Sequence, residues 1–159
     1  MGLLVSSASA SFVVRWVHVL GMVVVVGGSA SLCIMLLSNR GEGEPVWESA
    51  RLRAAMGYEW AFWAAIGVLV LTGVGNAGAF AGHLPTPETV WGWKFVAKLF
   101  GVLGLIVVSF LRTCLVAQWG RGQGPRFGHP APHMIGGAYA ATVFLAVAIL
   151  SMALSLAHG

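Results

Sequence analysis

Four long apolar segments constrain the fold of this chain more than any other feature of its sequence. They run from about residue 12 to 37, 58 to 80, 91 to 116 and 134 to 157. A helix needs about 20 predominantly apolar residues to cross the hydrocarbon core of a bilayer. The segments are continuously apolar and lack the polar–apolar alternation of barrel strands. The sequence therefore predicts an all-α integral membrane protein, a bundle of four transmembrane helices.

Composition agrees with a chain whose main solvent is lipid. Hydrophobic residues make up 58% of its 159 residues and charged residues only 9%, whereas an average soluble domain is about 25% charged. The length predicts one transmembrane domain spanning residues 1–159. The net charge of +4 comes from scattered basic residues, a distribution typical of membrane topology control and not of nucleic-acid binding.

The arginines outside the apolar segments predict how the chain lies in its membrane. Arg40, Arg51 and Arg53 fall in the first connection, and Arg121 and Arg126 fall in the third. The N-terminus, the second connection and the C-terminal end carry no arginine or lysine. Since basic connections stay on the cytoplasmic side, we expect a multi-pass inner (plasma) membrane protein. Both termini would lie on the outer, periplasmic side.

Ionisable side chains within the apolar segments point to a functional layer, because such groups are costly in lipid. Arg15, His18 and Met22 share one face of the first predicted helix, and Lys94 and Lys98 share one face of the third. The predicted topology places all five in the outer half of the membrane. It places two further residues in the same layer, Asn76 and Met152.

Cations and an imidazole in low dielectric require an anion nearby. Glu59, the acidic residue at the edge of a segment, is predicted at the opposite, cytoplasmic end. A haem b supplies anionic propionates on an apolar ring, and histidine and methionine are both haem ligands. We therefore expect His18 to ligate the iron, with Met22 or Met152 as a sixth ligand. The residues expected to bind the rest of the cofactor are Arg15, Asn76, Lys94 and Lys98.

Simpler interpretations stand beside this one. Arg15 and Lys94 lie near a predicted interface, where long basic side chains reach water. A membrane histidine such as His18 also serves to bridge helices through hydrogen bonds. Glycines such as Gly27 and Gly28 allow helices to pack closely, and equally leave room for a flat cofactor.

The first segment, RWVHVLGMVVVVGG, resembles the WxHxLxxxxWxGG pattern of the copper resistance protein D family and of the related HemJ-type proteins linked to haem synthesis. The match includes Trp16, His18 and the pair Gly27–Gly28. LTGVGNAG followed by WGWKFVAKLFGVLGLI is similar to the next two spans of that group, with Lys98 as the best match to its lysine and Lys94 as the alternative. Val25 or Val26 stands where the group has an aromatic residue, and the fourth segment lacks an internal histidine. The resemblance implies a haem b-binding or copper-associated membrane protein.

Four functions follow as hypotheses. The first is a cytochrome b-like electron-transfer protein or an accessory subunit of a respiratory or photosynthetic complex, rather than an independent enzyme. Its expected partners are the lipid bilayer, a quinone, and further copies of itself or a larger membrane complex. The alternatives are copper transport or resistance, a HemJ-like protoporphyrinogen oxidase, and a structural subunit without a cofactor.

Overall fold

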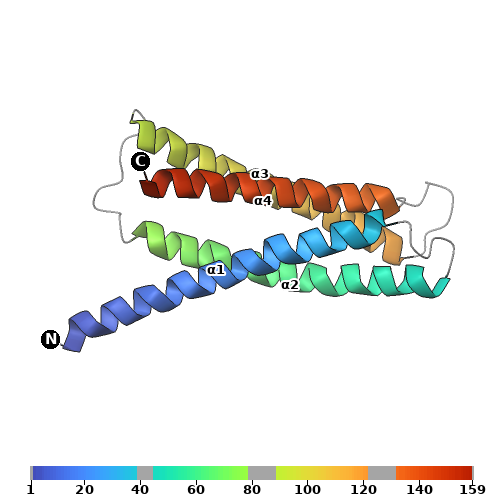
Figure 1. Cartoon of the computed structure of the whole chain (residues 1–159), viewed down its shortest axis with the longest axis horizontal. Helices are drawn as coiled ribbons and strands as arrows, with labels where there is room; N and C mark the ends of the chain where they lie inside the picture. The colour runs from blue at the N-terminus through green and yellow to red at the C-terminus, as the bar shows by residue number, and fades with distance from the viewer. Residues whose placement is uncertain (1, 39–44, 79–88, 122–131, 159) are drawn as a thin grey trace.

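The computed structural model describes residues 2–38, 45–78, 89–121 and 132–158, and these residues are almost entirely helical. The helices are α1 (Gly2–Leu37), α2 (Pro45–Gly78), α3 (Val90–Gly120) and α4 (Pro132–His158) (Figure 1). Each is long and apolar enough to cross a membrane. The predicted all-α bundle of four membrane-spanning helices is therefore confirmed in these residues.

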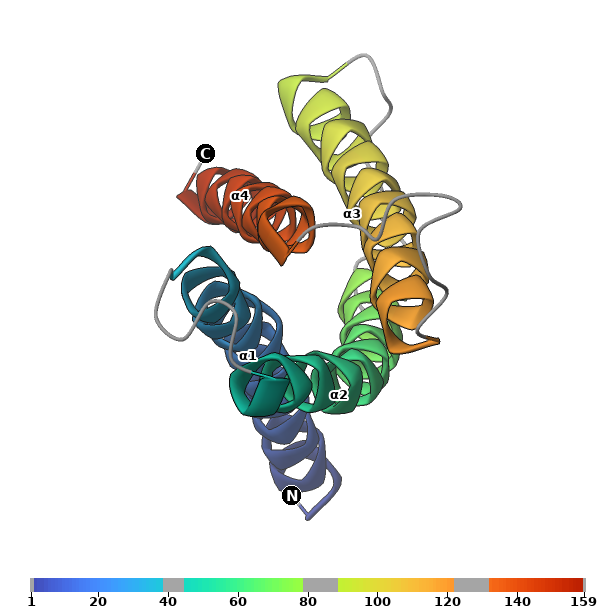
Figure 2. The same cartoon turned by 90° about the vertical axis from the view of Figure 1, so that its right-hand side faces the viewer.

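The helices run alternately up and down, so both termini lie at one end of the bundle, on the left in Figure 1. We call this the terminus end and the opposite one the far end. Around the bundle, α1 packs against α2 and α4, and α4 packs against α3. The α2–α3 pair packs least closely, and α1 diverges from the other helices toward the terminus end (Figures 1 and 2). The bundle is therefore tighter toward its far end.

Large apolar side chains cover the outside of the bundle. Trp60 is 84% exposed, Leu71 75% and Phe144 74%. In water such a surface would associate, whereas in a bilayer it faces acyl chains. The exterior therefore fits contact with lipid along the length of the four helices.

Helix α2 begins well before the apolar segment from which it was predicted. The sequence placed Glu48, Arg51 and Arg53 in a polar connection, but all three lie within α2. Pro45 suits a first helical position because its fixed backbone angle matches a helix. Arg51 is buried, and its Nη2 donates to the carbonyl of Ser38 over 2.9 Å. The prediction took the start of the apolar segment as the start of the helix. Helix propensity and the hydrogen bond from Arg51 to Ser38 extend the helix beyond that segment.

The core consists of two clusters of buried side chains. The cluster nearer the far end includes Leu36, Val116, Ile135 and Tyr139, and it also contains Trp119. Trp119 is only 6% exposed, although it lies one residue from the end of α3. The other cluster is centred on the middle of the bundle. Its fully or largely buried members include Val25, Phe62, Ile66, Leu105 and Ala146.

The contact between α1 and the Tyr58 ring of α2 depends on a glycine. A Cβ atom added at Gly28 would lie 2.1 Å from Cε2 of Tyr58, whereas one added at Gly27 would meet nothing within 4 Å. The absence of a side chain at Gly28 is therefore what allows the Tyr58 ring to lie against α1. This is the small-residue packing that membrane helices use to bring backbones together.

We predict that Gly28→Ala destabilises the protein by about 1–3 kcal/mol, the usual cost of overpacking a close contact. The added methyl group would displace the Tyr58 ring. Reversible unfolding in mixed detergent micelles measures this cost. Gly27→Ala is the matched control and should change stability by no more than about 0.5 kcal/mol. Equal effects of the two substitutions would contradict the predicted contact.

Candidate functional site

A buried ion pair joins α2 to α3 in the interior of the bundle. Arg112 Nε donates to Glu59 Oε1 over 2.9 Å, and Arg112 Nη2 donates to Glu59 Oε2 over 3.1 Å. The Arg112 side chain is fully buried, and that of Glu59 is 8% exposed. The two parallel hydrogen bonds fix both the distance and the orientation of the charged groups. In a low-dielectric interior, each charge offsets part of the desolvation cost of the other.

Polar groups from α3 and α4 complete the surroundings of this pair. The Tyr139 hydroxyl donates to Glu59 Oε1 over 2.7 Å, and Thr113 donates to Glu59 Oε2. Arg112 Nη1 donates to the Thr142 hydroxyl over 2.9 Å. The carboxylate thus accepts four hydrogen bonds, about as many as its lone pairs allow. Protein groups therefore supply the hydrogen bonds that water would otherwise give to the Glu59 carboxylate.

Aromatic rings enclose the guanidinium group. The Cζ atom of Arg112 lies 4.1 Å from the centre of the Phe62 ring and 4.5 Å from that of Tyr139. A cation over a ring face is attracted by the ring's quadrupole, most strongly where water is excluded. Phe62 comes from α2 and Tyr139 from α4, so the cation–π contacts bring the same helices together as the hydrogen bonds do.

Tyr58 extends this network to α1. Its hydroxyl donates to the Val25 carbonyl over 2.9 Å, and lies 2.9 Å from the hydroxyl of Ser29. Its ring also packs 5.9 Å from that of Tyr139, measured between ring centres. All four helices therefore contribute to one connected cluster, which we call the ion-pair cluster.

The sequence interpretation missed this cluster. It placed Glu59 at the edge of a span and did not pair it with Arg112, which lies near the end of the third segment. The signal was present: the predicted topology puts the start of the second segment and the end of the third at one membrane depth. The same layering argument that grouped His18 with Lys98 would have grouped Glu59 with Arg112.

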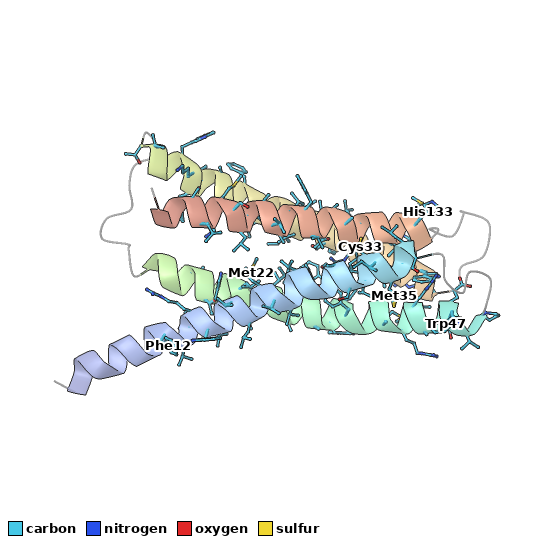
Figure 3. The ribbon with its side chains drawn as sticks, viewed as in Figure 1. Phe12, Met22, Cys33, Met35, Trp47 and His133 are labelled. Atoms are coloured by element: carbon cyan, nitrogen blue, oxygen red, sulfur yellow. The ribbon has the colours of Figure 1, made fainter. Side chains whose placement is uncertain are left out.

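A separate cavity of about 240 Å³ lies between the helices on the terminus side of the ion-pair cluster. His18 and Met22 line it from α1, and Lys98 lines it from α3. Figure 3 labels Met22 partway along α1, with His133 and Trp47 at the far end. The remaining lining is almost wholly apolar and comes from α2, α3 and α4, including Leu69, Val74, Phe95, Val102 and Ile149. The structure thus brings three predicted site residues to one cavity.

The His18 ring is held by a hydrogen bond that also sets which nitrogen carries the proton. Nδ1 of His18 lies 2.7 Å from the Thr72 hydroxyl, which lies 2.7 Å from the Val68 carbonyl one turn back on α2. The hydroxyl has one proton, and donating it to the carbonyl avoids an unfavourable contact between two acceptor oxygens. Nδ1 is then the donor to Thr72, and Nε2 keeps its lone pair. Neutral histidine with a lone pair on Nε2 is a form that binds a metal, and a hydrogen bond at Nδ1 is what fixes it.

The other predicted site residues do not line this cavity. Arg15 is exposed and Lys94 is half-buried, and Met152 on α4 is 39% exposed. The side chain of Asn76 lies outside the described part of the chain. In the described residues, no three histidine, cysteine or acidic side chains are grouped closely enough to hold a metal ion.

The cavity and the ion-pair cluster are stacked along the bundle axis. The inner end of the cavity is lined by Ile66 and Ala146, each four residues from a cluster member, Phe62 on α2 and Thr142 on α4. Four residues of helix correspond to about 6 Å. The cluster therefore forms the floor beneath the cavity, one helical turn away on two helices.

Fold and site together define a class, that of polytopic helical membrane proteins with a buried ion-pair cluster and a histidine-lined intramembrane cavity. Comparison with known proteins narrows this no further, since no family model, curated protein or solved structure matches the chain.

We predict that Glu59→Gln destabilises the bundle by about 3–5 kcal/mol, because it leaves the buried Arg112 guanidinium without a counter-charge. The double variant Glu59→Met/Arg112→Met removes both charges and should recover most of this loss. Detergent unfolding of the two variants measures the difference. Glu48→Gln, which changes an exposed carboxylate on the same helix, is the control. A double variant no more stable than Glu59→Gln would show that the pair is not a coupled unit.

Proposed function

We propose that this protein is a haem b-binding, cytochrome b-like membrane protein that exchanges electrons with a bilayer quinone or a partner membrane complex. The observation that carries the proposal is His18. Its imidazole borders an apolar cavity, with Nδ1 bonded to Thr72 and Nε2 carrying the lone pair. The resemblance of the first segment to haem-linked HemJ-type proteins supports the same cofactor. When bound, the haem would supply one-electron chemistry at its iron.

The residues around the cavity fit the two kinds of surface that a haem presents. Apolar side chains from α2, α3 and α4 match the ring, and the Lys98 ammonium group matches a propionate. The volume of about 240 Å³ is below the range of about 300–1,000 Å³ usual for ligand sites. A bound haem would therefore have to widen the cavity. Among neighbouring helices, α2 and α3 pack least closely, so the cavity can widen between them.

Of the iron ligands expected from the sequence, His18 is the one that the cavity favours. Met22 lies one turn along the same helix, so the two side chains project in the same direction. Both would then approach a bound cofactor from the same side of the cavity. Met152, the other sulfur ligand expected from the sequence, does not line the cavity. Of these three residues, His18 would therefore hold the iron.

A second tetrapyrrole-based function rests on the same cavity. A protoporphyrinogen substrate carries the same two propionates as haem, so Lys98 and His18 would face it in the same way. This HemJ-like oxidase differs from the cytochrome in that the tetrapyrrole leaves the cavity after reaction. Haem that stays bound through purification would favour the cytochrome over the oxidase.

We predict that the purified protein shows a Soret band that His18→Ala abolishes. The reason is that His18 supplies the bond to iron, whereas apolar contacts alone hold haem weakly. Absorption spectra in the oxidised and reduced states measure this. His133→Ala, at the far end of the bundle (Figure 3), is the control and should leave the band unchanged. The haem assignment fails if there is no Soret band, or if the band persists in His18→Ala.

The Thr72 hydrogen bond gives the same assignment a graded test. Thr72→Val removes the acceptor that orients His18, and loss of such a partner lowers the affinity of a metal site by about 10–100-fold. Thr72→Ser keeps the hydroxyl and should retain most of the affinity. Haem titration of the protein depleted of haem measures both. Similar affinities for the two variants would mean that Thr72 does not position His18.

A further inference from the structure

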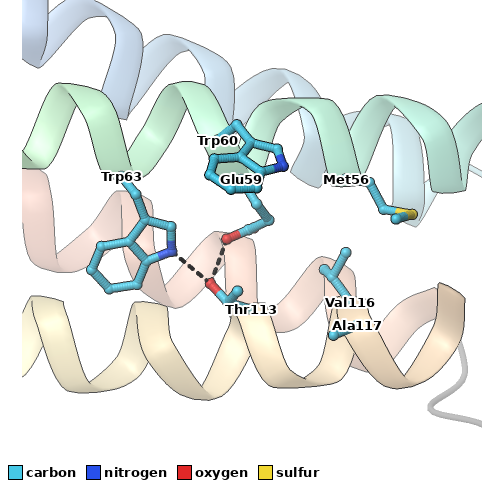
Figure 4. A pocket seen from close by; sticks show the side chains of 7 residues that line it. All are labelled: Met56, Glu59, Trp60, Trp63, Thr113, Val116 and Ala117. Carbon is cyan, nitrogen blue, oxygen red and sulfur yellow. Dashed lines mark hydrogen bonds between the residues drawn. The ribbon is translucent and has the colours of Figure 1, made fainter. Parts of the chain in front are cut away.

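A second recess, separate from the cavity, lies between α2 and α3 and opens toward the bilayer. Its volume is about 330 Å³, and none of its lining residues lines the cavity. Met56, Trp60, Trp63 and Ala117 form its walls, and Glu59 and Thr113 form its floor (Figure 4). We call it the α2–α3 groove. A molecule dissolved in the membrane can enter it sideways, and its inner end would meet the carboxylate of the ion-pair cluster.

Glu59, on the floor of the groove, can accept a hydrogen bond from a ligand and still keep the same number of hydrogen bonds. The Thr113 hydroxyl has a single proton but two acceptors in range, Glu59 Oε2 and the Ser109 carbonyl, the second at 2.9 Å. If a ligand hydroxyl donates to Glu59, the Thr113 proton can turn to Ser109. Trp63 Nε1 continues to donate to the Thr113 oxygen over 3.0 Å. Glu59 therefore keeps a full set of hydrogen bonds with or without a ligand.

The walls of the groove favour an aromatic ring. Two indoles and a thioether border it, and both groups interact with aromatic rings beyond simple apolar burial. Trp60 is 84% exposed and Met56 48%, so both are accessible from the lipid. An aliphatic alcohol would satisfy the floor but gain nothing from these walls. A negatively charged head would be repelled by Glu59 and is excluded.

We propose that the α2–α3 groove binds the hydroxylated aromatic head of a bilayer-dissolved quinol, which donates a hydrogen bond to Glu59 and packs its ring between the tryptophans. The groove and the cavity share no lining residue, so binding here does not require haem. Only transfer of electrons from the quinol to the cavity rests on the proposed function.

Photo-crosslinking tests the proposal, because free partitioning of a quinol into lipid does not obscure it. The purified full-length protein in phosphatidylcholine nanodiscs is labelled with an azido-quinol, and the labelled peptides are identified by mass spectrometry. We expect label within residues 56–63 and 113–117. Unlabelled decylubiquinol should compete, and its dimethyl ether, which lacks the donor, should compete about tenfold or more weakly. Hexadecanol should compete no better than the ether.

Substitutions in the groove supply the structural control. Ala117→Leu fills the groove without altering the ion pair and should lower labelling at least several-fold. Ala141→Leu makes the same change at an exposed position on α4 and should leave labelling unchanged. The proposal is overturned if Ala117→Leu labels normally, or if the ether or hexadecanol competes as well as decylubiquinol. The latter result would mean that the groove holds acyl chains or alcohols without selecting a quinol. A missing Soret band leaves each of these outcomes unaffected.

Discussion

The ion pair between Glu59 and Arg112 is the interaction on which the rest of this bundle depends. In lipid, apolar helices gain little by exchanging acyl chains for one another, so close packing and interhelical hydrogen bonds decide their arrangement. Here the two charges draw in Tyr139 and Thr142 from α4, and the neighbouring Tyr58 reaches α1. Either charge left alone in this interior would be costly. The paired charges and their hydrogen-bond partners consequently hold the four helices in one register.

The position of this cluster explains why the bundle has a cavity at all. Toward the far end the helices are closely packed around Leu36, Val116 and Ile135. Toward the terminus end α1 diverges (Figure 1), and His18 and Lys98 line the cavity there together with apolar side chains. The cluster therefore joins all four helices just below the cavity, and the helices lie farther apart above it. Such an arrangement suits a ligand that enters from the membrane.

The cavity and the α2–α3 groove differ in the chemistry they offer. The cavity presents a nitrogen lone pair and an ammonium group, which suit a metal and an anion. The groove presents a carboxylate and a threonine, which suit a hydroxyl donor. Phe62, which stacks on Arg112, lies between Glu59 and the cavity-lining Ile66 along α2. The proposed haem and the proposed quinol would thus bind within a short distance of each other along α2.

Apolarity alone was enough to predict the four helices, because lipid requires every span to be both long and helical. Spacing on a helix was enough to predict that His18 and Met22 share a face, and antiparallel topology placed Lys98 beside them. Membrane depth would also have grouped Glu59 with Arg112, but it could not indicate the individual side-chain contacts around them. Tyr139 reads as an ordinary aromatic residue of the fourth segment, and Gly28 as one glycine among many. Their roles depend on where Glu59 and Tyr58 point, and this is a property of the packed bundle. The early start of α2 was missed because its first turns are polar, and a search for apolar segments passes over them.

The electron paramagnetic resonance spectrum of the purified ferric protein tests the central claim most directly, since it reports how many strong ligands the iron has. A single protein ligand, His18, predicts a high-spin ferric haem whose signal is lost in His18→Ala. A low-spin signal, a haem signal that persists in His18→Ala, or no haem signal at all, would contradict the account.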